Sequence, residues 1–151
     1  MKNIGLLIIL ALTISSQKPN EDAKLNLLLD NWHLSAAQAN FDSYFNITDE
    51  SFIFLGTAPG ERWDKKQFMN FSKPYFDQGK AWEFKSTERN WAFSRNGKIA
   101  WFDEVLDTWM KDCRGSGVFV KRKGVWKLMQ YNLTVLIENE KVQEFIELRN
   151  K

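Results

Sequence analysis

The sequence has few residues that could build covalent or metal centres. Among 151 residues there is one cysteine, Cys113, and one histidine, His33. A single cysteine cannot form an internal disulfide, and one Cys and one His far apart do not make a metal cluster. The chain also lacks a phosphate-binding glycine loop and a nucleophile elbow. We therefore expect no metal and no cofactor, and Cys113 to be a small structural residue at a strand end.

A strong excess of either charge is also missing. The chain has 21 Lys and Arg against 19 Asp and Glu, which gives a formal net charge of +2. A balance this close to neutral does not indicate a nucleic acid or a charged membrane surface as the partner.

Long hydrophobic runs are absent outside the first sixteen residues. "MKNIGLLIILALTISS" places one lysine before an apolar run and then small polar residues, the layout of a signal peptide over 1–16. The run is shorter than the ~20 residues of a spanning helix. Cleavage fits after Ser15, Ser16 or Gln17, and an uncleaved anchor or a buried helix is the alternative. We expect an exported protein, periplasmic or secreted, without membrane contact after cleavage.

Aromatic residues, in contrast, are abundant: 12 Phe, 7 Trp and 3 Tyr make up 15% of the chain. Such side chains dominate the burial energy of a core, and they also line the walls of ligand pockets.

Periodicity predicts helices first and strands later. The apolar residues Leu25, Leu28, Leu29, Trp32, Ala36 and Ala39 recur at helical spacing, and Asp64 with Gln67 forms a capping-box pattern that opens a helix over 65–78. From residue 82 onward, long alternating segments meet at "RNGK" and "KG", which predicts two hairpins. This order indicates an α+β domain over 22–137, followed by a charged helical tail over 138–151.

Several motifs resemble the nuclear transport factor 2-like superfamily, and more closely its SnoaL-like branch. They are "GTAPGERW", "KPYF", "AWFDEVL" and "RGSGVFVKRKGVWKLMQYNLT", and the likeness covers about residues 22–135. The resemblance implies a cystatin-like cone, in which a curved antiparallel sheet wraps around N-terminal helices and leaves a cavity. Members bind small hydrophobic molecules there, act as isomerases, dehydratases or hydrolases, or dimerise. Relatives often have histidine where this chain has Asn132, which argues against proton transfer from that position.

The last strand suggests which residues face such a cavity. Strict alternation in "GVWKLMQYNLTV" puts Gln130 and Asn132 on the same face as the apolar Trp126 and Leu128. We expect these two amides to orient a ligand from within an apolar wall. The aromatic residues Tyr44, Trp63 and Trp101 are the expected ligand contacts in that wall.

Asp103 and Glu104 are adjacent on one strand, so at most one of them can face the cavity. A two-residue Asn96-Gly97 loop pairs Arg89 with Glu104, and a three-residue loop pairs it with Asp103. Asn-Gly favours the first. We therefore expect Asp103 to be the freer acid and the candidate general base, while a cross-strand ion pair is the structural alternative.

Arg114 depends on the next hairpin. A three-residue turn over 122–124 places it opposite Asn132, on the cavity face, where it could bind a carboxylate. A two-residue turn moves it to the outer face. We favour the three-residue turn because Lys123 is a poor first residue for the tight type.

Three functions fit these observations. The first is binding of a small hydrophobic or amphipathic molecule by an exported domain. The second is isomerase, dehydratase or hydrolase chemistry with Asp103 as base. The third is a structural or partner-binding homodimer that joins through the outer sheet face, where alternation places an apolar patch. That patch comprises Val118, Val120, Met129, Tyr131 and Leu133.

Overall fold

The computed structural model describes residues 21–150, and the predicted signal peptide lies outside these residues. The element order is α1 (Glu21–Ala37), α2 (Phe41–Asn46), β1 (Thr48–Leu55), β2 (Arg62–Asp64), α3 (Lys65–Asp77), β3 (Lys85–Phe93), β4 (Ile99–Thr108), β5 (Lys111–Arg122), β6 (Val125–Val135), a short 3-10 helix (Asn139–Lys141) and α4 (Val142–Arg149). Within the described range, no helix is long and apolar enough to cross a membrane.

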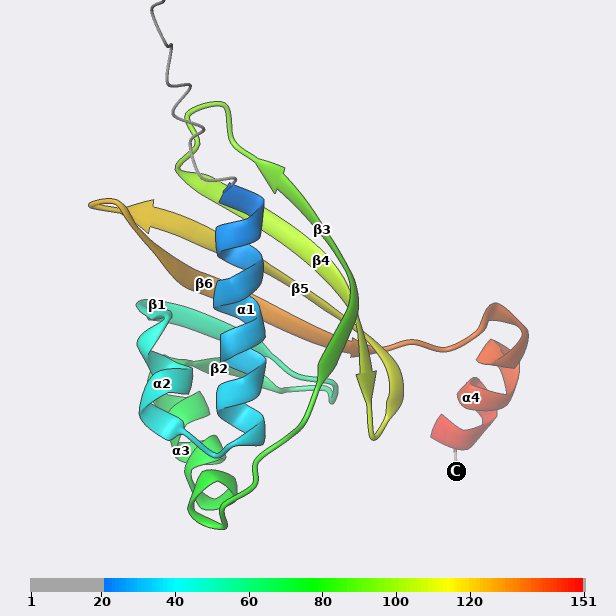
Figure 1. Cartoon of the computed structure of the whole chain (residues 1–151). Coiled ribbons are helices and arrows are strands. Elements are labelled where there is room, and N and C mark those ends of the chain that lie inside the picture. Colours follow the sequence, from blue (N-terminus) through cyan, green and yellow to red (C-terminus); the bar gives the residue numbers. More distant parts are fainter. Residues whose placement is uncertain (1–20, 151) are drawn as a thin grey trace, which may run out of the picture.

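The strands form one curved sheet in the order β2-β1-β6-β5-β4-β3, with α1, α2 and α3 against one face (Figure 1). The β1–β6 pair is parallel, and the other neighbours are antiparallel. The sheet is not closed into a barrel. The predicted fold class, an α+β domain with a curved sheet around N-terminal helices, is confirmed.

The helices follow from their sequence patterns. In α1 the predicted stripe residues Leu25, Leu29, Trp32 and Ala36 are buried, whereas Leu28 is half-buried and Ala39 lies beyond the end of the helix. α3 begins at the predicted capping box, since the Asp64 carboxylate accepts from the Gln67 N–H and the Gln67 side chain accepts from the Asp64 N–H. Each helix packs its apolar side against the sheet.

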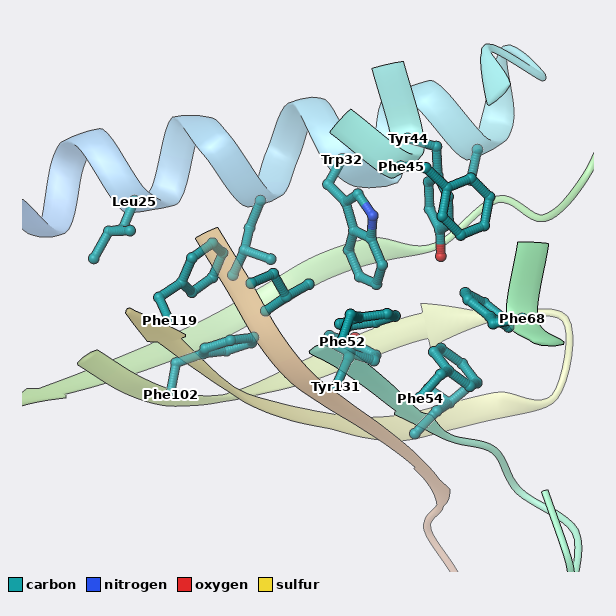
Figure 2. Packing of buried hydrophobic residues seen from close by; sticks show 14 of the residues in the cluster. Leu25, Trp32, Tyr44, Phe45, Phe52, Phe54, Phe68, Phe102, Phe119 and Tyr131 are labelled. Carbon is teal, nitrogen blue, oxygen red and sulfur yellow. The ribbon is translucent and has the colours of Figure 1, made fainter. Parts of the chain in front are cut away.

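The concave side of the sheet and the helices share one aromatic core (Figure 2). Trp32 and Tyr44 from the helices stack with their ring centroids 4.7 Å apart, and both face Phe52 and Tyr131 from the sheet. These aromatic residues are almost completely buried. Most of the aromatic side chains therefore pack in the core, and this packing fixes the helices against the sheet.

β6 contains a bulge that changes which side chains face inward. Phe119 of β5 pairs with Leu128, whereas Val118 pairs with Gln130, so Met129 is left without a partner. A residue inserted in this way shifts the alternation of every later residue in the strand. After the bulge, Tyr131 and Leu133 are buried, and Gln130 is exposed.

The β5–β6 hairpin closes with two residues. Arg122 pairs with Val125, and both Lys123 (φ 49°) and Gly124 (φ 83°) have left-handed backbone conformations. This is the geometry of a tight turn whose twist suits a hairpin. The predicted three-residue turn is therefore wrong, because Lys123 adopts the conformation that its side chain disfavours.

The C-terminal α4 stands apart from the rest of the domain (Figure 1). No residue of α4 is buried, and its apolar residues Val142, Phe145, Ile146 and Leu148 are exposed. The domain core thus ends with β6.

Candidate functional site

A cavity of about 240 Å³ lies between the helices and the concave face of the sheet. Pockets for drug-sized ligands usually measure about 300–1,000 Å³, so this cavity suits a smaller molecule. Its deep part is formed by the buried lining residues Trp32, His33, Tyr44, Phe54, Phe68, Tyr131 and Leu133. The half-buried and exposed lining residues are Gly56, Thr57, Glu61, Trp63, Phe71, Tyr75, Ala81, Trp82, Phe84, Trp109 and Met110.

Stacked rings make up one wall of the cavity. Phe54 from β1 lies on Phe68 from α3, with centroids 3.9 Å apart and planes 9° apart. Trp63 from β2 lies in the same way on Phe71, at 4.4 Å and 23°. Aromatic pairs are stabilised by about 0.5–1.5 kcal/mol beyond area burial, so this wall is preformed.

The loop between β1 and β2 brings a carboxylate to the cavity. Gly60 has φ 87°, as expected at the third position of a Pro59-Gly60 type II turn. Glu61 follows the turn, and its Oε2 accepts a hydrogen bond from the Ala58 N–H at 3.0 Å. A Cβ added to Gly56 would lie 2.2 Å from this oxygen, so glycine at 56 makes room for the carboxylate.

Glu104 is the centre of a buried polar network behind the cavity wall. Its side chain is fully buried, and its Oε1 contacts His33 Nε2 at 3.0 Å and accepts from the Tyr131 hydroxyl at 2.8 Å. Oε2 accepts two bonds from the Arg89 guanidinium, at 2.9 and 2.8 Å. The network joins α1, β3, β4 and β6, and it satisfies both oxygens of the carboxylate.

These contacts determine the protonation of the network. Burial acts to raise the pKa of Glu104, but the hydrogen bond and charge of His33, together with Arg89, outweigh it and lower the pKa to about 2. Because Glu104 is then ionised, His33 Nε2 carries the proton in this contact. Glu104 is held as an anion and is a weak proton acceptor.

Both tyrosines of the deep cavity keep their protons. Burial raises the pKa of Tyr131 well above its usual value, and the charge of Glu104 raises it further. Burial also raises the pKa of Tyr44, against a small lowering by its hydrogen bond with Trp82. Figure 2 shows the Tyr44 hydroxyl directed from the helices toward the sheet, which makes it an available donor within the cavity.

Of the residues predicted for the site, Tyr44 and Trp63 line the cavity. The predicted cavity position is wrong for Gln130 and Asn132, because the bulge at Met129 turns both to the outer face. There Asn132 donates to the Thr134 hydroxyl at 3.1 Å.

The same correction applies to Trp101, Asp103 and Arg114. Trp101 and Asp103 alternate with the buried Phe102 and Glu104, so they lie on the outer face. Trp101 is 47% exposed, and Asp103 accepts a hydrogen bond from Asn90. The predicted Arg89–Glu104 register is confirmed, yet Glu104 is the inward acid. Arg114 is exposed on the outer face, as a two-residue turn requires, and the bulge in β6 sets its pairing with Thr134.

The outer face is less apolar than the sequence indicated. The predicted patch is wrong for Tyr131 and Leu133, which the bulge turns inward. The apolar residues of the outer face include Ile99, Trp101, Val118 and Val120. The polar Asp103, Ser116 and Asn132 lie in the next row of pairs across the strands.

Sequence reasoning missed His33, Glu104, Tyr131 and Glu61 as wall or network residues. His33 was not predicted to lie in the wall, but it is only 5% exposed. Its position four residues after Leu29 on the buried stripe was a usable signal. Tyr131 and Glu104 could be assigned only with the bulge and the direction of the pleat known.

A metal centre does not emerge from the described part of the chain, where no group of three His, Cys, Asp or Glu side chains is placed to hold an ion. Cys113 is fully buried at the start of β5, with its sulfur 3.6 Å from the Thr108 hydroxyl.

Comparison with known proteins places this geometry in a family. The model of the SnoaL-like domain matches residues 25–138. Similar solved structures include a Nostoc punctiforme domain of unknown function with a cystatin-like fold. It has 14% identity and a TM-score of 0.69, over 89% of both chains.

A putative ketosteroid isomerase from Parabacteroides distasonis has 13% identity and a TM-score of 0.64, over 81% of this chain and 92% of that one. A putative calcium/calmodulin dependent protein kinase II association domain from Xanthomonas campestris has 17% identity and a TM-score of 0.61, over 86% and 99%. A search of curated proteins found no match. These structural likenesses show a shared fold, and with the domain match they establish that the chain belongs to the SnoaL-like branch of the nuclear transport factor 2-like superfamily.

Proposed function

We propose that this domain binds a small, largely apolar molecule in the cavity between α1–α3 and the sheet, and does so without chemical conversion. The observation that carries the proposal is the preformed aromatic wall around a 240 Å³ space. An apolar cavity with a few placed polar groups is the usual form of a small-molecule site. The Tyr44 hydroxyl and the indole N–H of Trp63 supply such groups.

The absence of conversion is supported by the state of Asp103 and Glu104. Asp103, the expected base, lies on the outer face. Glu104 is saturated by His33, Tyr131 and Arg89, and its pKa of about 2 makes it a poor base at neutral pH.

The test is calorimetric titration of the protein with 2-phenylethanol and with indole, two small neutral aromatic probes. Ala81→Phe places a ring at the cavity wall and should reduce binding at least about tenfold by occupying the space. Ala92→Phe makes the same change on β3 opposite Trp101, on the outer face, and should leave binding unchanged. Equal loss in both variants, or no binding by the parent protein, would contradict the proposal.

Catalysis is the second candidate, and His33 is the observation that favours it. The imidazole lies at the cavity wall, and Glu104 fixes its Nε2 proton, as a carboxylate orients a catalytic histidine in many enzymes. The name of the Parabacteroides relative, a putative ketosteroid isomerase, is consistent with this reading. Exchange of the α-protons of a ketone probe in D₂O, lost in His33→Gln, would support it over binding alone.

Export and dimerisation complete the proposal. Export is supported by the pattern of residues 1–16, and mass spectrometry of the protein from its host should show a mature N-terminus at Ser16, Gln17 or Lys18.

Dimerisation through the outer face is supported by the exposed Trp101 and Ile99, and two similar structures are named as association domains. Sedimentation of Trp101→Ser should show a monomer where the parent protein shows a dimer.

A further inference from the structure

The charged side chains in the cavity wall indicate which kind of ligand the cavity would accept. Of the residues that the structure describes, the wall includes one carboxylate, Glu61, and one imidazole, His33, but no lysine or arginine. Glu61 is half-buried, and the adjacent Arg62 points to the opposite side and is exposed. Among residues 21–150, no Lys, Arg or His nitrogen lies within 4.0 Å of the Glu61 carboxylate.

The position of Glu61 is set by the backbone around it. Besides the bond from Ala58 to Oε2, the Glu61 carbonyl accepts from the Gly56 N–H at 2.8 Å, and the Glu61 N–H donates to the Ala58 carbonyl at 3.1 Å. The side chain also fills the space that glycine leaves at 56. The carboxylate is thus held in place, with Oε1 free of any hydrogen bond in the described chain. A fixed, partly desolvated carboxylate costs free energy unless a donor or a cation completes it.

The surrounding side chains suit a cation more than a neutral donor. Trp63 follows Glu61 by two residues and lines the same cavity, and Tyr75, Trp82 and Trp109 add further rings to this wall. Aromatic rings carry negative charge on their faces, and tryptophan attracts organic cations most strongly. A carboxylate among such rings, in a wall without lysine or arginine and with its one imidazole, His33, already paired with Glu104, disfavours an anion in the same space.

We infer that the cavity selects a small aromatic or aliphatic amine in its ammonium form, with the nitrogen at Glu61 and the apolar body against Phe54, Phe68 and Tyr131. This inference rests on the proposed function, because it assigns the ligand class of the same cavity. Glu61 sets the preference for charge, and the deep aromatic wall sets the size.

The test compares three probes of nearly equal size by calorimetry: 2-phenylethylammonium, 2-phenylethanol and phenylacetate. The ammonium should bind at least about tenfold more tightly than the alcohol, since charge-assisted hydrogen bonds are roughly twice as strong as neutral ones. Phenylacetate should bind more weakly than the alcohol.

Glu61→Gln keeps an oxygen that can accept from Ala58, removes the charge and replaces the other carboxylate oxygen with an NH₂ group. In this variant the ratio of ammonium to alcohol affinity should fall to about one, while the affinity for the alcohol stays within about twofold. Glu83→Gln is the control, because Glu83 is next to Trp82 in sequence but its side chain is 72% exposed and pairs with Lys80. This variant should leave the ratio of ammonium to alcohol affinity unchanged.

The outcomes separate the two claims. Binding of the alcohol with no preference for the ammonium, or a preference that survives in Glu61→Gln, overturns the inference and leaves the proposed function intact. No binding by any of the three probes overturns both.

Discussion

The two faces of the sheet differ most clearly at two adjacent residues of β4. Glu104 points inward, is fully buried and contacts His33, Arg89 and Tyr131. Asp103 points outward and accepts one hydrogen bond from Asn90. The inner face thus holds a closed network next to an aromatic cavity, whereas the outer face holds open polar contacts among apolar residues. Chemical type alone does not distinguish two such acids, because their environment decides what each can do.

The largest expected difference is in stability. Glu104→Ala should lower the free energy of unfolding by about 3–5 kcal/mol, because it leaves the buried Arg89 guanidinium without its main partner. Asp103→Ala should change it by only about 0.5 kcal/mol, as surface substitutions usually do. Urea denaturation of both variants checks the pair, and equal losses would show that the two faces are not distinct.

The comparison also predicts a dependence on pH. The pKa of Glu104 is about 2 in the folded protein against an ordinary value of 4.5, so the carboxylate stabilises the fold above about pH 4.5. This contribution, on the order of 3 kcal/mol, is lost as the pH falls from 4.5 toward 2. The stability gap between the parent protein and Glu104→Gln should shrink over this range in denaturation series. Other carboxylates are common to both proteins and cancel, so a constant gap would contradict the account.

The next prediction concerns the stability effect of the close packing around Glu104. A Cβ at Gly115 would lie 2.2 Å from the Tyr131 hydroxyl oxygen and 2.9 Å from Glu104. Gly115→Ala should therefore cost about 1–3 kcal/mol through overpacking. Ser116→Ala, one residue along and on the outer face, should be close to neutral. Thermal unfolding measures both, and a tolerated Gly115→Ala would indicate a looser network.

The smallest effect is expected from the C-terminal tail. Because α4 buries no residue, ending the chain after Glu138 should change the free energy of unfolding by less than about 0.5 kcal/mol. Chemical denaturation of the shortened protein checks this, and a large loss would place α4 within the cooperative unit.

Much of the fold could be predicted from local patterns. The α1 stripe, the Asp64–Gln67 capping box and the Arg89–Glu104 register each depend on residues a few positions apart or on one strong turn signal. Such signals act locally, and tertiary packing here agrees with them.

The site was harder because it depends on which way each strand faces. The bulge at Met129 has no glycine or proline to mark it, and it turns Gln130 and Asn132 outward and Tyr131 inward. The tight turn with Lys123 at a positive φ likewise places Arg114 on the outer face. Each is a one-residue difference, and a one-residue slip exchanges the two faces of a strand.

The most direct test of the account uses the methionines as reporters of the two faces. Met110 lies in the cavity wall, whereas Met129 lies at the bulge and is no part of that wall. With ¹³C-labelled methionine methyl groups, NMR spectra would be recorded during titration with 2-phenylethanol. The account predicts a saturable shift of the Met110 methyl signal with the Met129 signal unchanged. A shift of Met129 without one of Met110 would place the binding site on the outer face and contradict it.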